Sequence, residues 1–178
     1  MPMINKLSST QYKFDDSGHL VKADGKNSGG STYYSQKLDA GISSKTTIMI
    51  ARNQTVGIKR DGRSRVEDVD KKHGGGVTVP IPTGYQGMPG GGVFVVVTGN
   101  PNYNAVGDIG GKPQQMTAEP EQILMHEIVG HAVPMATARD NGTTATGRAV
   151  DDENIVRGQV GLPARKADDG DLEGGTNH

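Results

Sequence analysis

The chain of 178 residues carries 19 basic and 20 acidic side chains, 27 Gly, 9 Pro and no Cys, and only 34 of its residues are Ile, Leu, Val or Phe. The near-zero net charge argues against a nucleic-acid-binding surface, the absence of Cys excludes disulfides, thiolate metal sites and a cysteine nucleophile, and no apolar run approaches the roughly 20 residues of a membrane span. Because a composition this poor in apolar residues is typical of disorder only at high net charge, we expect a folded domain with Gly-rich loops.

The two ends of the chain differ in composition from its middle. Residues 1–30 are polar and rich in Gly and Ser, and Met1–Leu7 lacks the apolar segment of a secretory signal peptide. We interpret residues 1–30 as a polar tail or linker, or as a short hairpin that turns near residues 14–18, and this start is typical of a domain that ends a longer protein. Residues 31–165 would form the domain, and residues 166–178 an acidic, Gly-rich, disordered tail.

A helix and several short strands are expected in the first half of the domain. Tyr34, Leu38 and Ile42 recur at helical spacing, with Ser31 or Thr32 as the N-cap. Strand-like runs follow at residues 46–51, 55–59, 77–81 and 92–98. The last of them, GVFVVVT, is continuously apolar, as expected of a strand buried on both faces.

The second half of the domain is expected to be helical. We interpret the charged residues 60–76 and the polar residues 99–116 as loops. A helix with Thr117 as its N-cap and Pro120 in its first turn would run to about residue 135. After a Gly/Thr-rich loop at residues 141–147, a last helix near residues 151–160 would end at Gly161-Leu162-Pro163.

One segment of the chain carries recognisable chemistry. Residues 121–134 read EQILMHEIVGHAVP and place His126, Glu127 and His131 on a predicted helix. Two imidazoles on one helical face can bind Zn²⁺. A Glu beside the first His can act as the general base on an attacking water.

The spacing of the two histidines requires an irregular helix. They are separated as in HExxxH, and at about 100° per residue five residues place His131 roughly 140° away from His126. In a straight α-helix these side chains could not share one ion. A π-bulge adds one residue to a turn and restores a common face, and Gly130 is the residue type that tolerates irregular backbone there.

A third metal ligand is expected downstream, because catalytic zinc usually has three protein ligands. The acidic cluster at the start of the last predicted helix contains Asp152 and Glu153. Glu153 is the first choice, since a helix–loop–helix hairpin would return it to the metal, followed by Asp152 and then Asp140. Acidic residues at a helix start also have a purely structural explanation in the helix dipole.

Two resemblances follow from these residues. The string HEIVGH at residues 126–131 resembles HExxGH, the zinc motif of the dipeptidyl peptidase III family. The longer string HEIVGHA, followed by Glu153-Asn154-x-x-Arg157 and by GLP-x-R at residues 161–165, resembles NleD-like effector metallopeptidases and the zincin toxin domains of Rhs-type polymorphic toxins. The chain departs from the latter pattern in the extra residue between the histidines and in Thr146 or Gly147, where these families have an acidic residue.

The resemblance implies a small α+β, zincin-like domain with a twisted, mostly antiparallel sheet packed on the zinc helix. It implies a secreted zinc metallopeptidase with His126 and His131 as ligands and Glu127 as the base. Such a protein is an effector or toxin delivered by a specialised secretion system. It acts on a protein substrate in the cytoplasm of a target cell, and a cognate immunity protein is expected.

Two other interpretations remain at this point. In the first, the protein is a non-catalytic secreted binding module whose histidines are structural, and it binds no metal. In the second, the metal is structural and has four protein ligands, with His73 as a candidate for the fourth. Bound metal, and a water on that metal, distinguish the three.

Overall fold

The computed structural model describes residues 2–60, 62–85, 90–142 and 149–166. These residues form four small sheets and several helices, so the protein belongs to the α+β class, as the sequence indicated. Antiparallel pairings predominate, and the parallel pairing of β3 with β7 makes the sheet beside the long helix a mixed one.

Strand β7 (Gly92–Val97) is the central strand of a three-stranded sheet in the order β3–β7–β6. It pairs in parallel with β3 (Thr47–Arg52) and antiparallel with β6 (Gly76–Ile81). All four of its valines are at most 3% exposed. The predicted strand buried on both faces is therefore confirmed.

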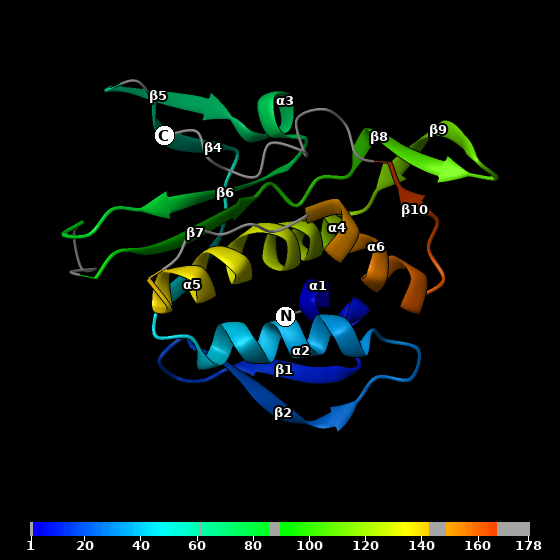
Figure 1. The fold of residues 1–178 in the computed structure, drawn as a ribbon, viewed down its shortest axis with the longest axis horizontal. Helices are drawn as coiled ribbons and strands as arrows, with labels where there is room; N and C mark the ends of the chain where they lie inside the picture. Colours follow the sequence, from blue (N-terminus) through cyan, green and yellow to red (C-terminus); the bar gives the residue numbers. More distant parts are fainter. Residues whose placement is uncertain (1, 61, 86–89, 143–148, 167–178) are drawn as a thin grey trace.

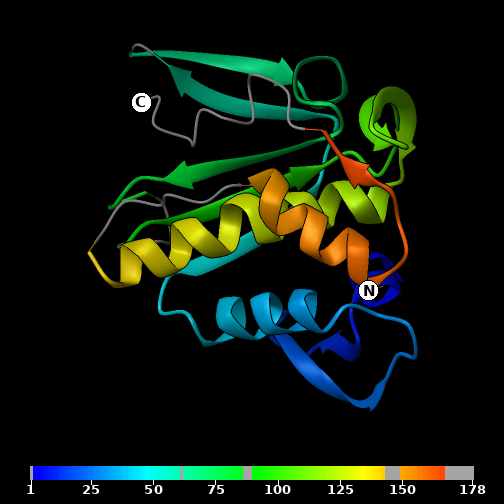
Figure 2. The same cartoon turned by 45° about the vertical axis from the view of Figure 1, so that its right-hand side comes forward.

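Helices cover one face of this sheet. Helix α4 (Pro120–His126) continues through the π-helix η1 (Glu127–Ala132) into α5 (Val133–Asp140), and together they form one long helix. This long helix lies between the β6–β7 strands and α2 (Thr32–Ser43), and α6 (Ala149–Gln159) packs beside it (Figures 1 and 2). Helix α2, the long helix and α6 correspond to the three helices predicted from the sequence.

The main apolar core fills the space between the sheet and the helices. It includes valines of β7, Tyr34 and Leu38 of α2, and Met125 and Val129 of the long helix. Burial of a large apolar side chain stabilises the fold by about 1.5–3 kcal/mol. The long helix thus has its apolar side chains in the core, and this contact fixes the position of its polar ones.

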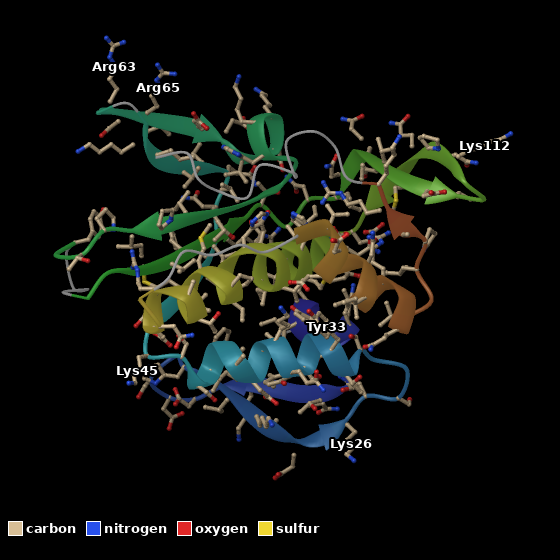
Figure 3. The ribbon with its side chains drawn as sticks, in the orientation of Figure 1. Lys26, Tyr33, Lys45, Arg63, Arg65 and Lys112 are labelled. Carbon is tan, nitrogen blue, oxygen red and sulfur yellow. The ribbon has the colours of Figure 1, made fainter. Side chains whose placement is uncertain are left out.

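The opposite face of the sheet is covered by the β4–β5 hairpin (Thr55–Arg60 and Arg63–Asp68) and α3 (Val69–His73). The prediction of a solvated loop at residues 60–76 is therefore wrong. Strand β5 has mostly exposed side chains and is held by its pairing with β4, so it shows no apolar alternation in the sequence. Its Arg63 and Arg65 project outward from the hairpin (Figure 3).

The N-terminal residues are part of the fold. Helix α1 (Pro2–Leu7) precedes a hairpin of β1 (Thr10–Phe14) and β2 (Leu20–Lys26). The expected hairpin is present. Residues 2–26 therefore do not form an unstructured tail. Three of their side chains belong to the main core, namely Ile4, Leu7 and Tyr12.

The fourth sheet lies beside the start of the long helix and contains β8 (Asn102–Ile109), β9 (Lys112–Ala118) and β10 (Ala164–Arg165). The loop predicted at residues 99–116 is wrong, because this region forms a hairpin around Gly110-Gly111. Both glycines have left-handed φ values, 65° and 77°, as tight hairpin turns require.

The start of the long helix also differs from the prediction. Thr117 belongs to β9, and the N-cap is Glu119, with Pro120 in the first turn. Most of the loop predicted at residues 141–147 and nearly all of the predicted acidic tail lie outside the described residues.

Candidate functional site

The π-helix brings the two histidines of the motif together. A π-turn closes its hydrogen bonds over five residues rather than four, so side chains five apart come to the same side. His126 ends α4 and His131 lies in η1, and their ring centroids are 5.1 Å apart in an edge-to-face arrangement. The irregular helix that the HExxxH spacing required is confirmed.

Gly130 allows helix α6 to approach the π-turn closely. A Cβ placed on Gly130 would lie 2.6 Å from Cβ and 2.9 Å from Cα of Ala149, the first residue of α6. Any side chain at this position would push the two helices apart. The glycine therefore does more than tolerate irregular backbone, because it brings α6 within reach of the histidines.

Helix α6 places the Glu153 carboxylate against His126. Glu153 Oε2 lies 2.8 Å from Nδ1 of His126, and both residues are buried. Burial lowers the pKa of His126, but the hydrogen bond to Glu153 and the charges of Glu153 and Glu127 outweigh it, so the pKa is raised above its ordinary value. Burial raises the pKa of Glu153, but the hydrogen bond to His126 and the charges of His126, Arg165 and Arg157 lower it below its ordinary value.

Two arginines hold the same carboxylate. Arg157 Nη1 lies 3.1 Å from Oε1 of Glu153, and Arg165 Nη1 lies 3.2 Å from Oε2. Arg157 is fully buried and also donates from Nη1 to Gln122 Oε1 and from Nε to the carbonyl of Pro163. The cluster of His126, Glu153, Arg157 and Arg165, called the charged cluster below, is a hydrogen-bonded unit inside the protein.

The remaining residues of the downstream motif anchor this cluster. The Asn154 side chain accepts from the backbone N–H of Arg165 and donates to its carbonyl oxygen, at 2.7 and 2.9 Å. Gly161 adopts a left-handed φ of 71°, which ends α6. The EN-x-x-R and GLP-x-R strings thus converge on one histidine. Sequence reasoning did not find Gln122, although it lies four residues before His126 on α4.

Glu127 faces strand β6 of the β3–β7–β6 sheet. Its Oε2 accepts a 2.7 Å hydrogen bond from Oγ1 of Thr78 on β6. A Cβ placed on Gly76 would lie 2.9 Å from Cγ and 3.2 Å from Oε1 of Glu127. The absence of a side chain at Gly76 therefore leaves room for this carboxylate. No sequence signal pointed to Thr78.

The other candidate ligands are engaged away from the histidines. Asp152 points to α2, where Tyr33 and Lys37 bind its two oxygens, and Tyr33 lies on the side of α2 that faces α6 (Figure 3). Asp140 accepts hydrogen bonds from residues 44–46. His73 pairs with Glu67 at 2.8 Å.

Among the described residues, no group of three or more His, Asp or Glu side chains is arranged to hold a metal ion. The described part of the site offers an imidazole pair and a neighbouring carboxylate on Glu127. A second carboxylate, on Glu153, contacts Nδ1 of His126. Among all the residues that the structure describes, no helix is long and apolar enough to cross a membrane.

Comparison with known proteins adds no relative. No protein-family model, no curated protein and no solved structure matches the chain.

Proposed function

We propose that the protein is a zinc-dependent endopeptidase with a zincin-like arrangement, in which His126 and His131 bind Zn²⁺ and Glu127 is the general base. The observation that carries the proposal is the π-helix at residues 127–132. π-turns are rare and occur frequently at functional sites. This one occupies the turn in which an HExxxH spacing needs it.

The geometry of the histidine pair fits a shared zinc ion. Two imidazoles bound to one tetrahedral zinc at about 2.0–2.1 Å have ring centroids roughly 5 Å apart. The observed separation of 5.1 Å agrees with this value. When bound, Zn²⁺ would polarise the scissile carbonyl and lower the pKa of its water to about 7.

Glu127 would move the proton in this reaction. Thr78 holds one carboxylate oxygen, Oε2, and thereby orients the other. Glu127 would accept a proton from the attacking water and return it to the leaving amine. Strand β6 lies at the edge of its sheet in the described residues, so an extended peptide would add beside it as the next strand.

The biological setting that we propose rests on the sequence resemblance to effector and toxin metallopeptidases. In this setting the protein is secreted through a specialised system and cleaves a protein in the cytoplasm of a target cell. A cognate immunity protein would protect the producing cell. The chemistry of the site does not depend on this setting and can be tested first.

The test begins with metal content. Wild-type protein purified without chelator, or incubated with Zn²⁺, is expected to contain about one zinc per chain by elemental analysis. His131→Ala is expected to lose it, whereas His19→Ala, an exposed histidine in the β1–β2 turn, keeps it. A zinc-free wild-type protein would favour the binding-module interpretation, and metal lost in His73→Ala would favour the structural site.

Activity provides the second part of the test. Zinc-loaded protein is incubated with a library of fluorophore–quencher peptides, and cleavage is followed by fluorescence. Glu127→Gln should bind zinc normally and cleave about 10²–10⁴ times more slowly, because general acid–base catalysis typically contributes that factor. Full activity in this variant would refute the assignment of the base.

A further inference from the structure

We propose that Glu153 is a positioning residue: it accepts a hydrogen bond from Nδ1 of His126 and so leaves Nε2 as the nitrogen that binds the metal. This inference rests on the proposed function and revises the sequence prediction, which made Glu153 the third ligand. The sequence analysis expected a hairpin to return Glu153 to the metal, and in the structure the Glu153 carboxylate contacts Nδ1 of His126.

Both oxygens of the Glu153 carboxylate are already engaged. Oε2 lies 2.8 Å from Nδ1 of His126 and 3.2 Å from Nη1 of Arg165, while Oε1 lies 3.1 Å from Nη1 of Arg157. The side chain of Glu153 is 3% exposed. To bind a metal through Oε2, the oxygen beside the histidine, the carboxylate would have to leave the His126 or Arg165 donor in a buried position, where an unpaired polar group is costly.

The arginines determine where the proton of His126 lies. Guanidinium groups stay charged in proteins and cannot accept hydrogen bonds. Glu153 between two of them is an ionised carboxylate, which only accepts. The hydrogen of the His126–Glu153 contact is therefore on Nδ1, and the neutral ring has its lone pair on Nε2, the form that binds metals. Arg165 Nη1 lies 3.3 Å from Nδ1 of His126 because both nitrogens donate to the same oxygen, Oε2 of Glu153.

Each arginine is itself fixed, so the carboxylate has a defined position. Arg157 is held by Gln122 of α4 and by the carbonyl of Pro163. Arg165 is held through its backbone by Asn154. A carboxylate that binds the second nitrogen of a metal-ligating histidine fixes the ring and raises its basicity, and loss of such a partner typically costs 10–100-fold in metal affinity.

Helix α6 contains a matched control for Glu153. Asp152 precedes it in the chain and is also a paired, mostly buried carboxylate, with Lys37 Nζ 3.0 Å from its Oδ2. Its partners, Tyr33 and Lys37, lie on α2 and not at His126. Asp152→Asn and Glu153→Gln remove the same charge from neighbouring positions, and only the second changes the partner of the histidine.

The first measurement requires no variant and no metal. Long-range ¹H–¹⁵N NMR of the metal-free wild type reports the tautomer of each histidine, at a pH where the rings are neutral. His126, assigned by the signal lost in His126→Gln, is expected as the Nδ1–H tautomer. The Nε2–H tautomer would overturn the inference, even if the protein binds zinc.

The second measurement compares the two variants by competition with a chromophoric zinc chelator. Glu153→Gln is expected to bind zinc 10–100-fold more weakly than wild type, still at one zinc per chain, and Asp152→Asn with wild-type affinity. The visible spectrum of the Co²⁺-loaded protein should be the same in all three. An altered spectrum in Glu153→Gln would identify a ligand, and equal affinity in all three would leave Glu153 a structural role; either result overturns the inference.

Failure of the inference and failure of the proposed function give different results. A wild type that binds no zinc refutes the proposed function, and the inference with it. A wild type that binds one zinc, with Glu153→Gln unaffected, refutes the inference alone. Circular dichroism checks that each variant is folded, and if Glu153→Gln unfolds, the tautomer of the wild type decides.

Discussion

Two interiors of different chemistry meet at the long helix. On one side lies the apolar core, with Met125 and Val129 fully buried against the sheet and α2. On the other lies the charged cluster, in which Arg157 is fully buried and Glu153 is 2% exposed. Met125, Val129 and Arg157 are all 0% exposed, so the centres of both interiors are inaccessible to water, and Arg165 forms the partly exposed rim of the cluster. The two interiors differ in what each contributes to the free energy of folding.

The difference indicates why the charged cluster exists. Apolar burial stabilises a fold by roughly 25 cal/mol per Å², whereas a buried ion pair often stabilises no more than apolar residues of the same volume would. A chain with so few large apolar residues would gain from a larger core at this place. We attribute the presence of a four-residue charged cluster instead to the role proposed for His126, which the other three members hold.

The largest expected effect is the loss of stability in Arg157→Met, which is compared with an apolar substitution of similar volume in the apolar core. Arg157→Met leaves the buried Glu153 with one cation fewer and is expected to lower the free energy of unfolding by about 3–5 kcal/mol. Met125→Leu is expected to cost less than about 1.5 kcal/mol, because cores tolerate such exchanges. Urea unfolding at neutral pH measures both.

The comparison of the two interiors would fail if the two variants were equally stable. It becomes sharper with Glu153→Met added to Arg157→Met, which removes both charges of the pair. We expect this double variant to regain part of the lost stability, while its zinc affinity stays below that of wild type. A double variant less stable than either single one would contradict this account.

The contact between the π-turn and α6 gives the next largest effect. Gly130→Ala places a Cβ 2.6 Å from Cβ of Ala149 and forces the helices apart, at a cost of about 1–3 kcal/mol. Gly158→Ala on α6 is the control, because a Cβ there meets no atom within 4 Å and gains about 0.5–1 kcal/mol from helix propensity. Thermal unfolding that ranks the two in the opposite order would show that Gly130 is not a packing residue.

Part of this site could be predicted from the sequence, for physical reasons. Two histidines five positions apart cannot share a face of an α-helix, so HExxxH together with Gly130 indicated the π-turn. The continuous apolar run of β7 and the spacing of α2 indicated the elements on which the long helix packs. In each case one local rule, periodicity or backbone geometry, was sufficient.

The rest depends on contacts that leave no local pattern. Strands β5, β8 and β9 carry mostly exposed side chains, so pairing rather than burial holds them, and the turn residues Gly110-Gly111 were the available signal. The arrival of Glu153 at His126 could be predicted from the acidic cluster, but its approach to Nδ1 could not. That depends on Arg157 and Arg165, whose positions are set by Gln122 and Asn154.

The smallest expected effect concerns Asp140, a carboxylate at the C-terminal end of the long helix. It accepts hydrogen bonds from Ser44, from the backbone of Lys45, and from both the backbone and the side chain of Thr46. The hydrogen bond from the Thr46 side chain is the largest of the causes that lower its pKa. A depressed pKa in the folded state means that the stabilisation is complete above the unfolded-state pKa of about 3.9 and is lost as the pH falls through the folded value.

We therefore expect Asp140→Asn to lower the urea midpoint at neutral pH and to leave it nearly unchanged in strong acid, where the wild-type carboxyl is protonated as well. Asp24→Asn, which removes the same charge from an exposed position on β2, is the control at both pH values. A difference between wild type and Asp140→Asn that is constant from neutral pH to acid would show that shape, and not charge, ties this helix end to residues 44–46. Because Asp140 lies outside both interiors, zinc affinity is expected to be the same in the variant and in wild type at neutral pH.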